Sequence, residues 1–321
     1  MPSKSSSRER PTAFSFADLF AGIGGMRLAF AAAGGHCVFS SEWDQYAQKT
    51  YAANFGEVPR GDITKIQSSE IPKFDVLCAG FPCQPFSSIG KRQGFGHPTQ
   101  GTLFHEIVRI LRDHDECRAI LLENVPGLIT HDNGRTLSVI ESSLTELGFS
   151  FDYRVLDAHD FGVPQRRQRI YIVGTRLKGS TTIGRHEMEW GLPRRRHVDI
   201  GPFLESSVHG YEISKHLQDV YLSKHDDGRP EIVHRGTKGP VKTLVASYYK
   251  IQRLTGTFVR GGETGLRLLS ESECKAIMGF PKDFVIPVSR SQMYKQFGNS
   301  VAVPVVRALA KWIERDLLMP S

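Results

Sequence analysis

The chain has 321 residues, 40% of them hydrophobic, and a formal net charge of +7. This length suits two domains, or one large α/β domain with an insertion, and it allows a sizeable core. The five cysteines include no CxxC pair and no Cys/His ligand spacing, which argues against a disulfide framework and a zinc site, and no run is long and apolar enough to span a membrane. We therefore expect a cytoplasmic protein without a metal.

The first two thirds of the chain carry the pattern of an α/β domain. Residues 1–12 are rich in serine and charge and predict a disordered tail. Between residues 13 and 176, short apolar runs alternate with segments of helical spacing, which predicts a doubly wound, mostly parallel sheet with helices on both faces. The predicted strands are 14–20, 37–39, 76–77, 119–122, 151–156 and 170–173, and the predicted helices are 26–33, 46–55, 103–111 and 137–147.

The remaining third changes in character twice. Residues 177–267 are irregular and rich in glycine, histidine and arginine, which predicts a smaller inserted domain that faces the substrate. Residues 268–321 return to helical patterns and are expected to rejoin the first domain. Ser270 and Glu273 form a capping-box pattern before a short helix, and residues 303–317 predict a final amphipathic helix.

A glycine-rich turn follows the first predicted strand, at Gly22, Gly24 and Gly25. Such a turn lets the backbone approach a ligand at the start of a helix. A dinucleotide-binding fingerprint requires another glycine at the position of Arg27, so binding of NAD is disfavoured.

Three further groups at predicted strand ends suit an adenosine. The Glu42 carboxylate could accept from ribose hydroxyls, the Trp43 indole could stack on a purine, and Asp62 could accept from an adenine amino group. Each also has a purely structural interpretation, as a helix cap, a packed indole or a turn. Together they predict an adenosyl ligand with no pyrophosphate.

Cys83 follows the apolar run 75–80 and a stiffening proline, Pro82, which places the thiol where open α/β sheets hold their ligands. An isolated cysteine is otherwise more often a small core residue. Glu123 ends another predicted strand on the same edge, where burial would raise its pKa and let it donate a proton. Strand alternation sends Arg167 and Arg169 to one face, where they suit a phosphate or a carbonyl oxygen.

Basic residues cluster at 166–169, at 194–197 and again between 238 and 253, where Tyr248 and Tyr249 are interspersed. This distribution is compatible with nucleic acid, although charge runs are more commonly solvated surface.

Five segments carry a family resemblance: 20–25, 81–84, 123–125, 165–169 and 296–301. In this order they resemble the signature blocks of bacterial cytosine-5 DNA methyltransferases of restriction-modification systems. The resemblance implies a Rossmann-like, S-adenosylmethionine-dependent fold with residues 177–267 as a target recognition domain. It implies methylation at C5 of a cytosine flipped out of a specific double-stranded DNA sequence, through a covalent bond between Cys83 and C6. It also implies a monomer in the bacterial cytoplasm near the nucleoid, with a possible cognate restriction endonuclease that acts separately.

The resemblance also assigns individual residues. Glu123 would contact N3 and the exocyclic amine of cytosine, and Arg169 would hold O2. Cofactor contacts are expected from Phe20, Gly22, Gly24, Gly25, Glu42, Trp43, Asp62, Ile63, Pro82, Leu103, Asn299, Ser300 and Val301. DNA contacts are expected from Gln84, Ser87, Lys91, Arg92, Arg167, Arg235, Thr243, Tyr248, Lys250, Gln252 and Arg253.

One segment departs from the family pattern. Residues 87–102 are expected to form a mobile loop that closes over the flipped base, yet Gln100 stands where many members carry an arginine, and His97 could alter closure. Two alternatives were weighed. An RNA cytosine methyltransferase is disfavoured because the Cys-Phe-Thr motif of that branch is missing, and a catalytically silent DNA-binding homologue is disfavoured because Cys83, Glu123 and Arg169 are all present.

Overall fold

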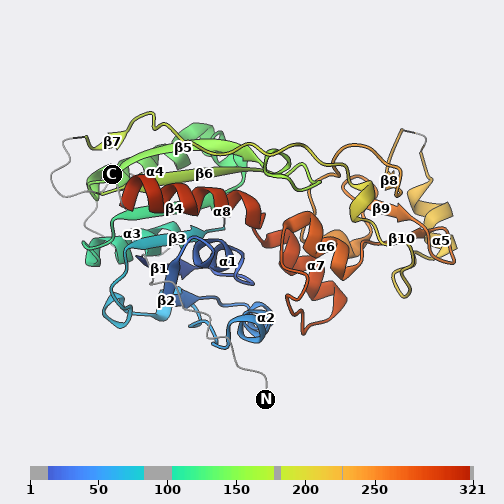
Figure 1. The fold of residues 1–321 in the computed structure, drawn as a ribbon, viewed down its shortest axis with the longest axis horizontal. Coiled ribbons are helices and arrows are strands. Elements are labelled where there is room, and N and C mark those ends of the chain that lie inside the picture. The colour runs from blue at the N-terminus through green and yellow to red at the C-terminus, as the bar shows by residue number, and fades with distance from the viewer. Residues whose placement is uncertain (1–13, 83–102, 177–181, 226, 319–321) are drawn as a thin grey trace, which may run out of the picture.

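The computed structural model describes residues 14–82, 103–176, 182–225 and 227–318. Its centre is a seven-stranded sheet in the order β2-β1-β3-β4-β6-β5-β7 (Figure 1). The strands are β1 (Phe14–Leu19), β2 (Gly35–Ser41), β3 (Val76–Gly80), β4 (Ala119–Asn124), β5 (Ser150–Asp157), β6 (Gln168–Thr175) and β7 (Gly184–Arg185). Strands β1 to β4 pair in parallel, whereas β6 is antiparallel to both of its neighbours. The sheet is therefore doubly wound and mostly parallel, as predicted.

Helices cover both faces of this sheet (Figure 1). They are α1 (Gly25–Ala31) and α8 (Val303–Trp312) on one face, and α3 (Leu103–Asp113) and α4 (Arg135–Glu146) on the other; α8 continues as a π-helix over Ile313–Leu318. Helix α2 (Gln45–Phe55) follows β2, whereas α5 (Lys215–Leu217), α6 (Glu271–Met278) and α7 (Arg290–Asn299) lie in or beside the inserted region (Figure 1). Alternation along the strands separates two cores: Cys78 and Leu121 pack with α1 and α8, and Leu77 and Ile120 pack with α3 and α4.

The inserted region contains a second, three-stranded sheet in the order β10-β9-β8, formed by β8 (Glu231–Val233), β9 (Thr257–Arg260) and β10 (Leu266–Arg267). These short strands were not predicted. Their buried side chains, such as Val233 and Phe258, belong to the same apolar cluster as Cys274 in α6 and Val305 in α8. The inserted sheet thus shares its core with the carboxyl-terminal helices.

The last helix returns to the main sheet, and the segment before it lies beside the glycine-rich turn. The predicted capping box is confirmed, because Ser270 Oγ accepts from the Glu273 amide (3.2 Å) and Glu273 Oε2 accepts from the Ser270 amide (2.8 Å). Helix α8 packs against α1. A Cβ atom at Gly25 would lie 2.8 Å from Ser300 Oγ and 2.9 Å from Val301. The segment 296–301 therefore lies directly beside the glycine-rich turn.

Candidate active site

The carboxyl ends of β1, β3 and β4 and the connection between α7 and α8 enclose a cavity of about 600 Å³. It is lined by residues predicted as cofactor or catalytic groups: Phe20, Gly22, Glu42, Trp43, Asp62, Ile63, Pro82, Leu103, Glu123, Arg169, Asn299 and Ser300. Arg167, predicted as a DNA contact, also lines it. Gly24, Gly25 and Val301 pack behind this wall and do not line the cavity. The fold thus brings segments from both ends of the chain to one edge of the sheet.

The glycine-rich turn depends on backbone conformations that side chains disfavour. Gly22 has φ +56°, and nothing lies within 4 Å of a Cβ atom built on it, so its surface is open to the cavity. Gly24 has φ +85°, and a Cβ atom there would lie 2.2 Å from the Phe55 ring. The first glycine leaves room for a ligand, and the second allows α2 to pack closely.

Glu42 is held in place by the turn that it faces. Its carboxylate accepts from the Gly22 amide and from the Asp44 amide, each at 2.8 Å. Burial raises the pKa of Glu42, and the two amide hydrogen bonds oppose that shift. The neighbouring Trp43 is 79% exposed, although most tryptophans are largely buried. A fixed carboxylate beside a bare aromatic ring fits a ribose and a purine.

Asp62 lies at the start of a 3₁₀ helix, Ile63–Lys65, and the prediction that it ends a strand is wrong. Its Oδ1 accepts from the Thr64 amide (3.1 Å) and hydroxyl (2.8 Å), so the side chain caps the turn. Only an isolated bridge between Ser41 and Arg60 extends the sheet at this point. Asp62 still lines the cavity.

Glu123 and Arg169 form the polar end of the cavity. They lie on the adjacent strands β4 and β6, with Arg169 Nε 3.1 Å from Glu123 Oε1 and side-chain exposures of 16% and 12%. Burial raises the pKa of Glu123, and the positive charges of Arg169 and Arg167 limit the shift. Arg169 and Arg167 therefore both lower the pKa of this carboxyl group, although of the two only Arg169 contacts it.

The Glu123 carboxyl group also lies next to the segment that leads to Cys83. Glu123 pairs in register with Gly80 on β3, and its Oε2 lies 3.5 Å from the position of a Gly80 Cβ atom. Asn124 donates to the Phe81 carbonyl (3.0 Å), which fixes the chain just beyond β3. Cys83 lies outside the described residues, as do Gln84, Ser87, Lys91, Arg92, His97 and Gln100.

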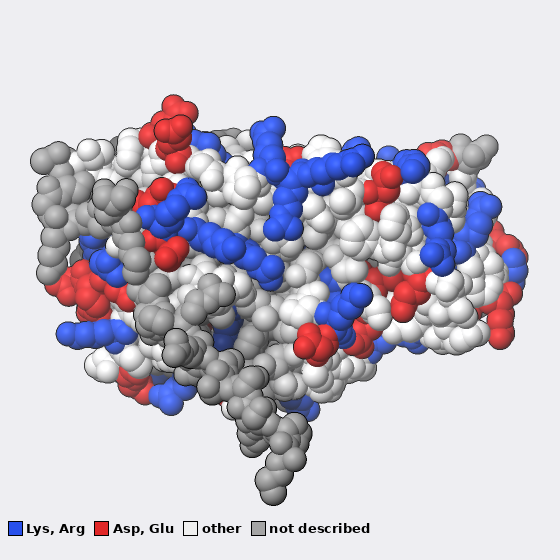
Figure 2. Space-filling model, viewed as in Figure 1, with Lys and Arg blue, Asp and Glu red and all other residues white. Residues whose placement is uncertain are grey.

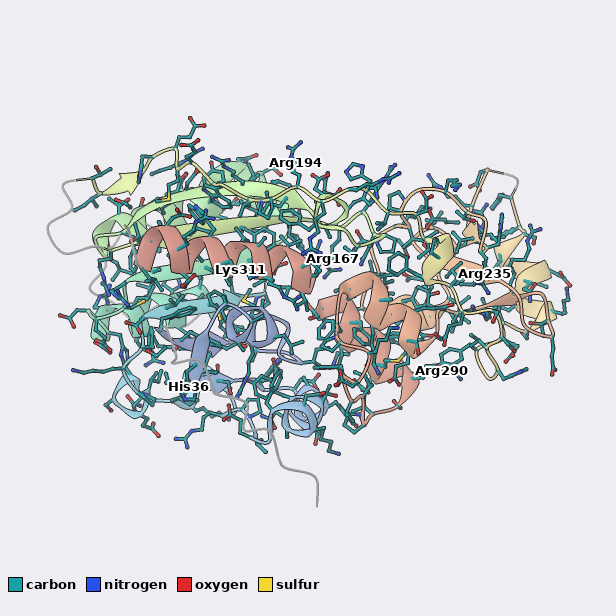
Figure 3. The ribbon with its side chains drawn as sticks, in the orientation of Figure 1. His36, Arg167, Arg194, Arg235, Arg290 and Lys311 are labelled. Carbon is teal, nitrogen blue, oxygen red and sulfur yellow. The ribbon has the colours of Figure 1, made fainter. Side chains whose placement is uncertain are left out.

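Three side chains predicted to contact DNA are instead buried and bound by protein partners. Arg167, 2% exposed, donates to main-chain carbonyl groups at the junction of the inserted region with the end of α7 (Figure 3). The Tyr248 hydroxyl donates to the Thr257 carbonyl and accepts from the Leu269 amide. Arg253 pairs with Asp227. Tyr248 and Arg253 belong to the inserted region, whose small core includes polar side chains that bond internally. Arg167 instead directly precedes β6 and is buried at the junction between the inserted region and the end of α7.

Other predicted DNA contacts are available at the surface. Arg235 and Lys250 are exposed, and Figure 3 shows Arg235 on the inserted region, away from the main sheet. Gln252 is half-buried, and its Oε1 accepts from the hydroxyl groups of Ser247 (3.0 Å) and Thr255 (3.2 Å). The Thr243 hydroxyl donates to the Arg166 carbonyl (2.6 Å), so it is already bonded to the segment that precedes β6.

Sequence reasoning missed several residues of the cavity wall, among them Lys295, Gln296 and Gly298 on α7. Lys295 pairs with Asp44 (2.7 Å) and Gln296 accepts from Thr50 (2.9 Å), so α7 is joined to α2 beside the site. The segment 290–299 is mostly polar, and it therefore gave no clear apolar period. The glutamine and lysine three and four residues before Asn299 were the only signal.

Basic side chains also gather outside the cavity. Figure 2 shows Lys and Arg in a band over α8 and the segment that precedes the inserted sheet. Arg194, Arg195, Arg196 and Lys311 are exposed, and none of them forms an ion pair with another described residue. Part of the basic excess is thus solvated surface.

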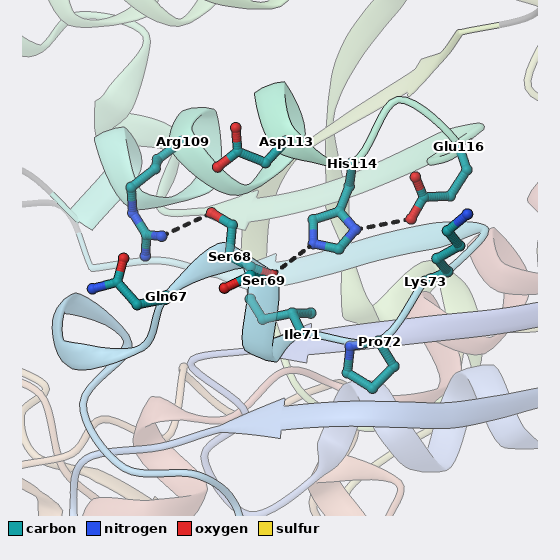
Figure 4. Close-up of a pocket in the computed structure, with 10 residues that line it drawn as sticks. All are labelled: Gln67, Ser68, Ser69, Ile71, Pro72, Lys73, Arg109, Asp113, His114 and Glu116. Carbon is teal, nitrogen blue, oxygen red and sulfur yellow. Dashed lines mark hydrogen bonds and ion pairs between the residues drawn. The ribbon is translucent and has the colours of Figure 1, made fainter.

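A second cavity lies between the Ser68–Glu70 turn and the end of α3 (Figure 4). Several of its polar groups bond to one another: Arg109 donates to Ser68 Oγ (2.9 Å), and the His114 ring lies between Glu116 Oε1 (2.8 Å) and the Ser68 carbonyl (3.2 Å). It contains none of the predicted site residues, and we assign it no ligand.

Two searches of the described residues gave negative results. No cluster of three or more His, Cys, Asp or Glu side chains in that part of the chain could hold a metal ion. Within the same ranges, no helix has the length and apolar character needed to cross a bilayer.

The sheet order, the two helical layers and the cavity at the strand ends define a Rossmann-like methyltransferase fold with an inserted recognition domain. Solved structures share this fold, including Schizosaccharomyces pombe Dnmt2 methyltransferase (TM-score 0.74, 21% identity, 94% of this chain and 98% of that one) and a Spodoptera frugiperda DNMT2 mutant (TM-score 0.72, 23% identity, 94% and 99%). Residues 14–315 match the model of the C-5 cytosine-specific DNA methylase family, and the chain belongs to this family.

Its relatives include enzymes of restriction-modification systems. Type II methyltransferase M.MspI of Moraxella sp is 58% identical over 304 residues, which cover 95% of this chain and 71% of the relative. Type II methyltransferase M.BsuFI of Bacillus subtilis is 55% identical over 312 residues, which cover 97% and 75%. The chain is thus a cytosine-5 DNA methyltransferase of restriction-modification type.

Proposed function

We propose that this enzyme transfers a methyl group from S-adenosylmethionine to C5 of a cytosine extruded from a specific double-stranded DNA sequence. The observation that carries the proposal is the Glu123–Arg169 pair at one end of a cavity whose other end presents Glu42 and Trp43. One end suits the edge of a cytosine and the other suits an adenosine, so the two reactants would meet in one enclosed space.

The residues of the cavity fit the cofactor. Glu42 would accept from the ribose hydroxyl groups, Trp43 and Phe20 would cover the adenine, and Asp62 and Ile63 would contact its amino edge. Pro82, Leu103 and the 299–301 segment would enclose the methionine portion. When bound, S-adenosylmethionine supplies an electrophilic methyl group on a sulfonium. The chain's own contribution is to orient that group toward the cytosine.

The proposed chemistry begins with Cys83. Its thiolate adds to C6, and the electron pair displaced by the new C6–S bond moves into the ring, where Glu123 at N3 and Arg169 at O2 stabilise it. The electron pair at C5 would then form the bond to the methyl group as the methyl–sulfonium bond breaks and S-adenosylhomocysteine leaves. A base would remove the C5 proton, and the released electron pair would restore the C5–C6 double bond and expel the Cys83 thiolate from C6. C5 and C6 are stacked inside duplex DNA, so the base must first leave the helix, at a cost of about a few kcal/mol.

Sequence recognition is proposed for the surface of the inserted region. Arg235, Thr243, Lys250 and Gln252 remain the candidates there, because guanine edges suit Arg and Lys, and adenine edges suit Gln. Gln84, Ser87, Lys91 and Arg92 would approach the DNA from the loop that follows Cys83. We also propose the domain division 13–176, 177–267 and 268–321, a monomer in the bacterial cytoplasm near the nucleoid, and a separately acting cognate endonuclease.

A methyl-transfer assay with a Glu123→Gln variant tests this proposal. Wild-type protein, S-adenosylmethionine with a tritiated methyl group and plasmid DNA should yield labelled 5-methylcytosine after hydrolysis of the DNA. Glutamine keeps the size of Glu123 but cannot donate a carboxyl proton, so turnover should fall by about 100-fold or more while cofactor affinity changes by less than about twofold. A wild type that labels no cytosine, or a variant that loses turnover and cofactor affinity equally, would contradict the assignment.

A further inference from the structure

We propose that Arg167 is a positioning residue that couples cofactor binding to DNA recognition, because it fastens the cofactor-side loop to the first recognition segment. The inference rests on the proposed function, in which residues 299–301 enclose the cofactor and residues 243–252 face DNA. The sequence suggested a DNA contact for Arg167, and the structure gives it a different place.

The Arg167 guanidinium joins two segments that are distant in sequence. Nη1 donates to the Leu244 carbonyl (3.0 Å), and Nη2 donates to the carbonyl groups of Gly298 (2.9 Å) and Ser300 (2.5 Å). Leu244 follows Thr243 on the recognition side, and Ser300 lines the cofactor cavity. One side chain therefore fixes the main chain on both sides of the junction (Figure 3).

The two segments also touch directly. A Cβ atom at Gly298 would lie 2.2 Å from the Ala246 amide nitrogen and 2.3 Å from the Val245 carbonyl carbon. Glycine is the residue that permits this approach, because any side chain would collide with backbone. With the backbones in contact and three carbonyl groups held by one guanidinium, neither segment can shift without moving the other or breaking these hydrogen bonds.

Burying the Arg167 charge costs free energy that a purely structural contact between the two segments would not require. Among the described residues it forms no ion pair, and its Nε has no hydrogen-bond partner. Burial and, after it, the neighbouring Arg169 charge lower the pKa of Arg167 to about 9. Arg267 offers the contrast: it is equally buried, but it pairs with the Glu273 carboxylate at 2.7 Å. Arg267 stabilises the inserted region, whereas Arg167 is held at the boundary between two binding surfaces.

Coupling between the two ligands provides the test. The affinity of S-adenosylhomocysteine, a non-reacting product, is measured by calorimetry without DNA and with a saturating duplex that contains the methylated sequence, identified by bisulfite sequencing. Wild type should bind the cofactor product about tenfold more tightly with DNA, within the usual range of coupling energies. Arg167→Met should reduce that ratio to about one, and Arg167→Lys, which keeps a donor but not the fork, should give an intermediate ratio.

Arg267→Met is the matched control. It removes an equally buried arginine, so it should lower the melting temperature but keep the wild-type ratio. If Arg167→Met does not fold, the lysine variant decides: a wild-type ratio there overturns the inference, as does a wild-type ratio in a folded methionine variant. A wild type that binds both ligands without coupling also overturns it. A wild type that binds neither ligand refutes the proposed function itself.

Discussion

At the scale of single residues, the site combines buried carboxyl groups with different roles. Glu42 accepts two main-chain amides and is thereby held as an acceptor, whereas Glu123 is paired with a single arginine side chain. Both have a raised pKa, because burial dominates in each case. This difference in partners supports the proposed roles, ligand binding for Glu42 and proton donation for Glu123.

A third carboxyl group, Asp18, makes the stability of the fold depend on pH. It lies in β1 directly below the glycine-rich turn, with Oδ2 unpartnered and Cys78 Sγ 3.6 Å from Oδ1. Burial raises the pKa of Asp18 from 3.8 to about 7. Since the folded state holds this proton more tightly than the unfolded state, the stability that it contributes is fully present below pH 4 and is lost as pH rises toward 7.

Asp18→Asn should therefore flatten the pH dependence of stability. From pH 5 to pH 8, the wild type should lose roughly 2 to 3 kcal/mol of unfolding free energy through this group, and the isosteric variant should not. Urea unfolding at the two pH values measures the difference. Asp75→Asn serves as the control: hydrogen bonds from Ser15 and Arg118 outweigh burial and lower the Asp75 pKa, so this group is ionised in both states from pH 5 to pH 8 and its variant should keep the wild-type pH dependence. An Asp18→Asn variant with the wild-type pH profile would refute the assigned burial.

At the scale of elements, the main sheet was largely predictable and the inserted region was not. The apolar runs 119–122 and 170–173 lie within β4 and β6, because strands buried on both faces must be apolar throughout. The strands β8 to β10 are two to four residues long, too short to show a period. Helix α7 is ten residues long but mostly polar, so it shows no clear apolar period.

The sequence was sufficient to predict the types of residue in the site. It was not sufficient to predict which of their side chains are buried. Glycine turns can be recognised in the sequence because their backbone conformation requires glycine. Carboxyl groups at strand ends can be recognised because the proposed chemistry requires that residue type. Arg167, Tyr248 and Arg253 look like nucleic-acid contacts because they are basic or aromatic, yet their burial is decided by segments up to 133 residues away in sequence. Pattern alone carries no information about such partners.

The capping box of α6 gives an element-scale prediction. Ser270→Ala removes the hydroxyl that accepts from the Glu273 amide, so it should lower the unfolding free energy by about 1 kcal/mol. Ser289→Ala is the matched control, because Ser289 occupies the same position before α7 without a side-chain cap hydrogen bond. Chemical denaturation compares the two variants. Equal losses in both would show that the capping box contributes nothing specific.

At the scale of the whole molecule, the inserted sheet is joined to the carboxyl-terminal helices by a shared apolar core and by the Arg167 junction. The cavity lies where these parts meet the edge of the main sheet. DNA bound by the inserted region would thus lie next to the end of the cavity that holds Glu123. This arrangement fits the proposal that one chain both reads a DNA sequence and modifies a base within it.

The central claim is that Cys83 forms a covalent bond to C6 of a cytosine in duplex DNA. A duplex of mixed sequence with 5-fluorocytosine in place of cytosine, incubated with the protein and S-adenosylmethionine, should yield a protein–DNA adduct that survives denaturing electrophoresis, because fluorine at C5 cannot leave as a proton does. Cys83→Ser should abolish the adduct, and Cys117→Ser, a buried thiol far from the site, should not. A wild type that forms no adduct, or an adduct that persists in Cys83→Ser, would contradict the account.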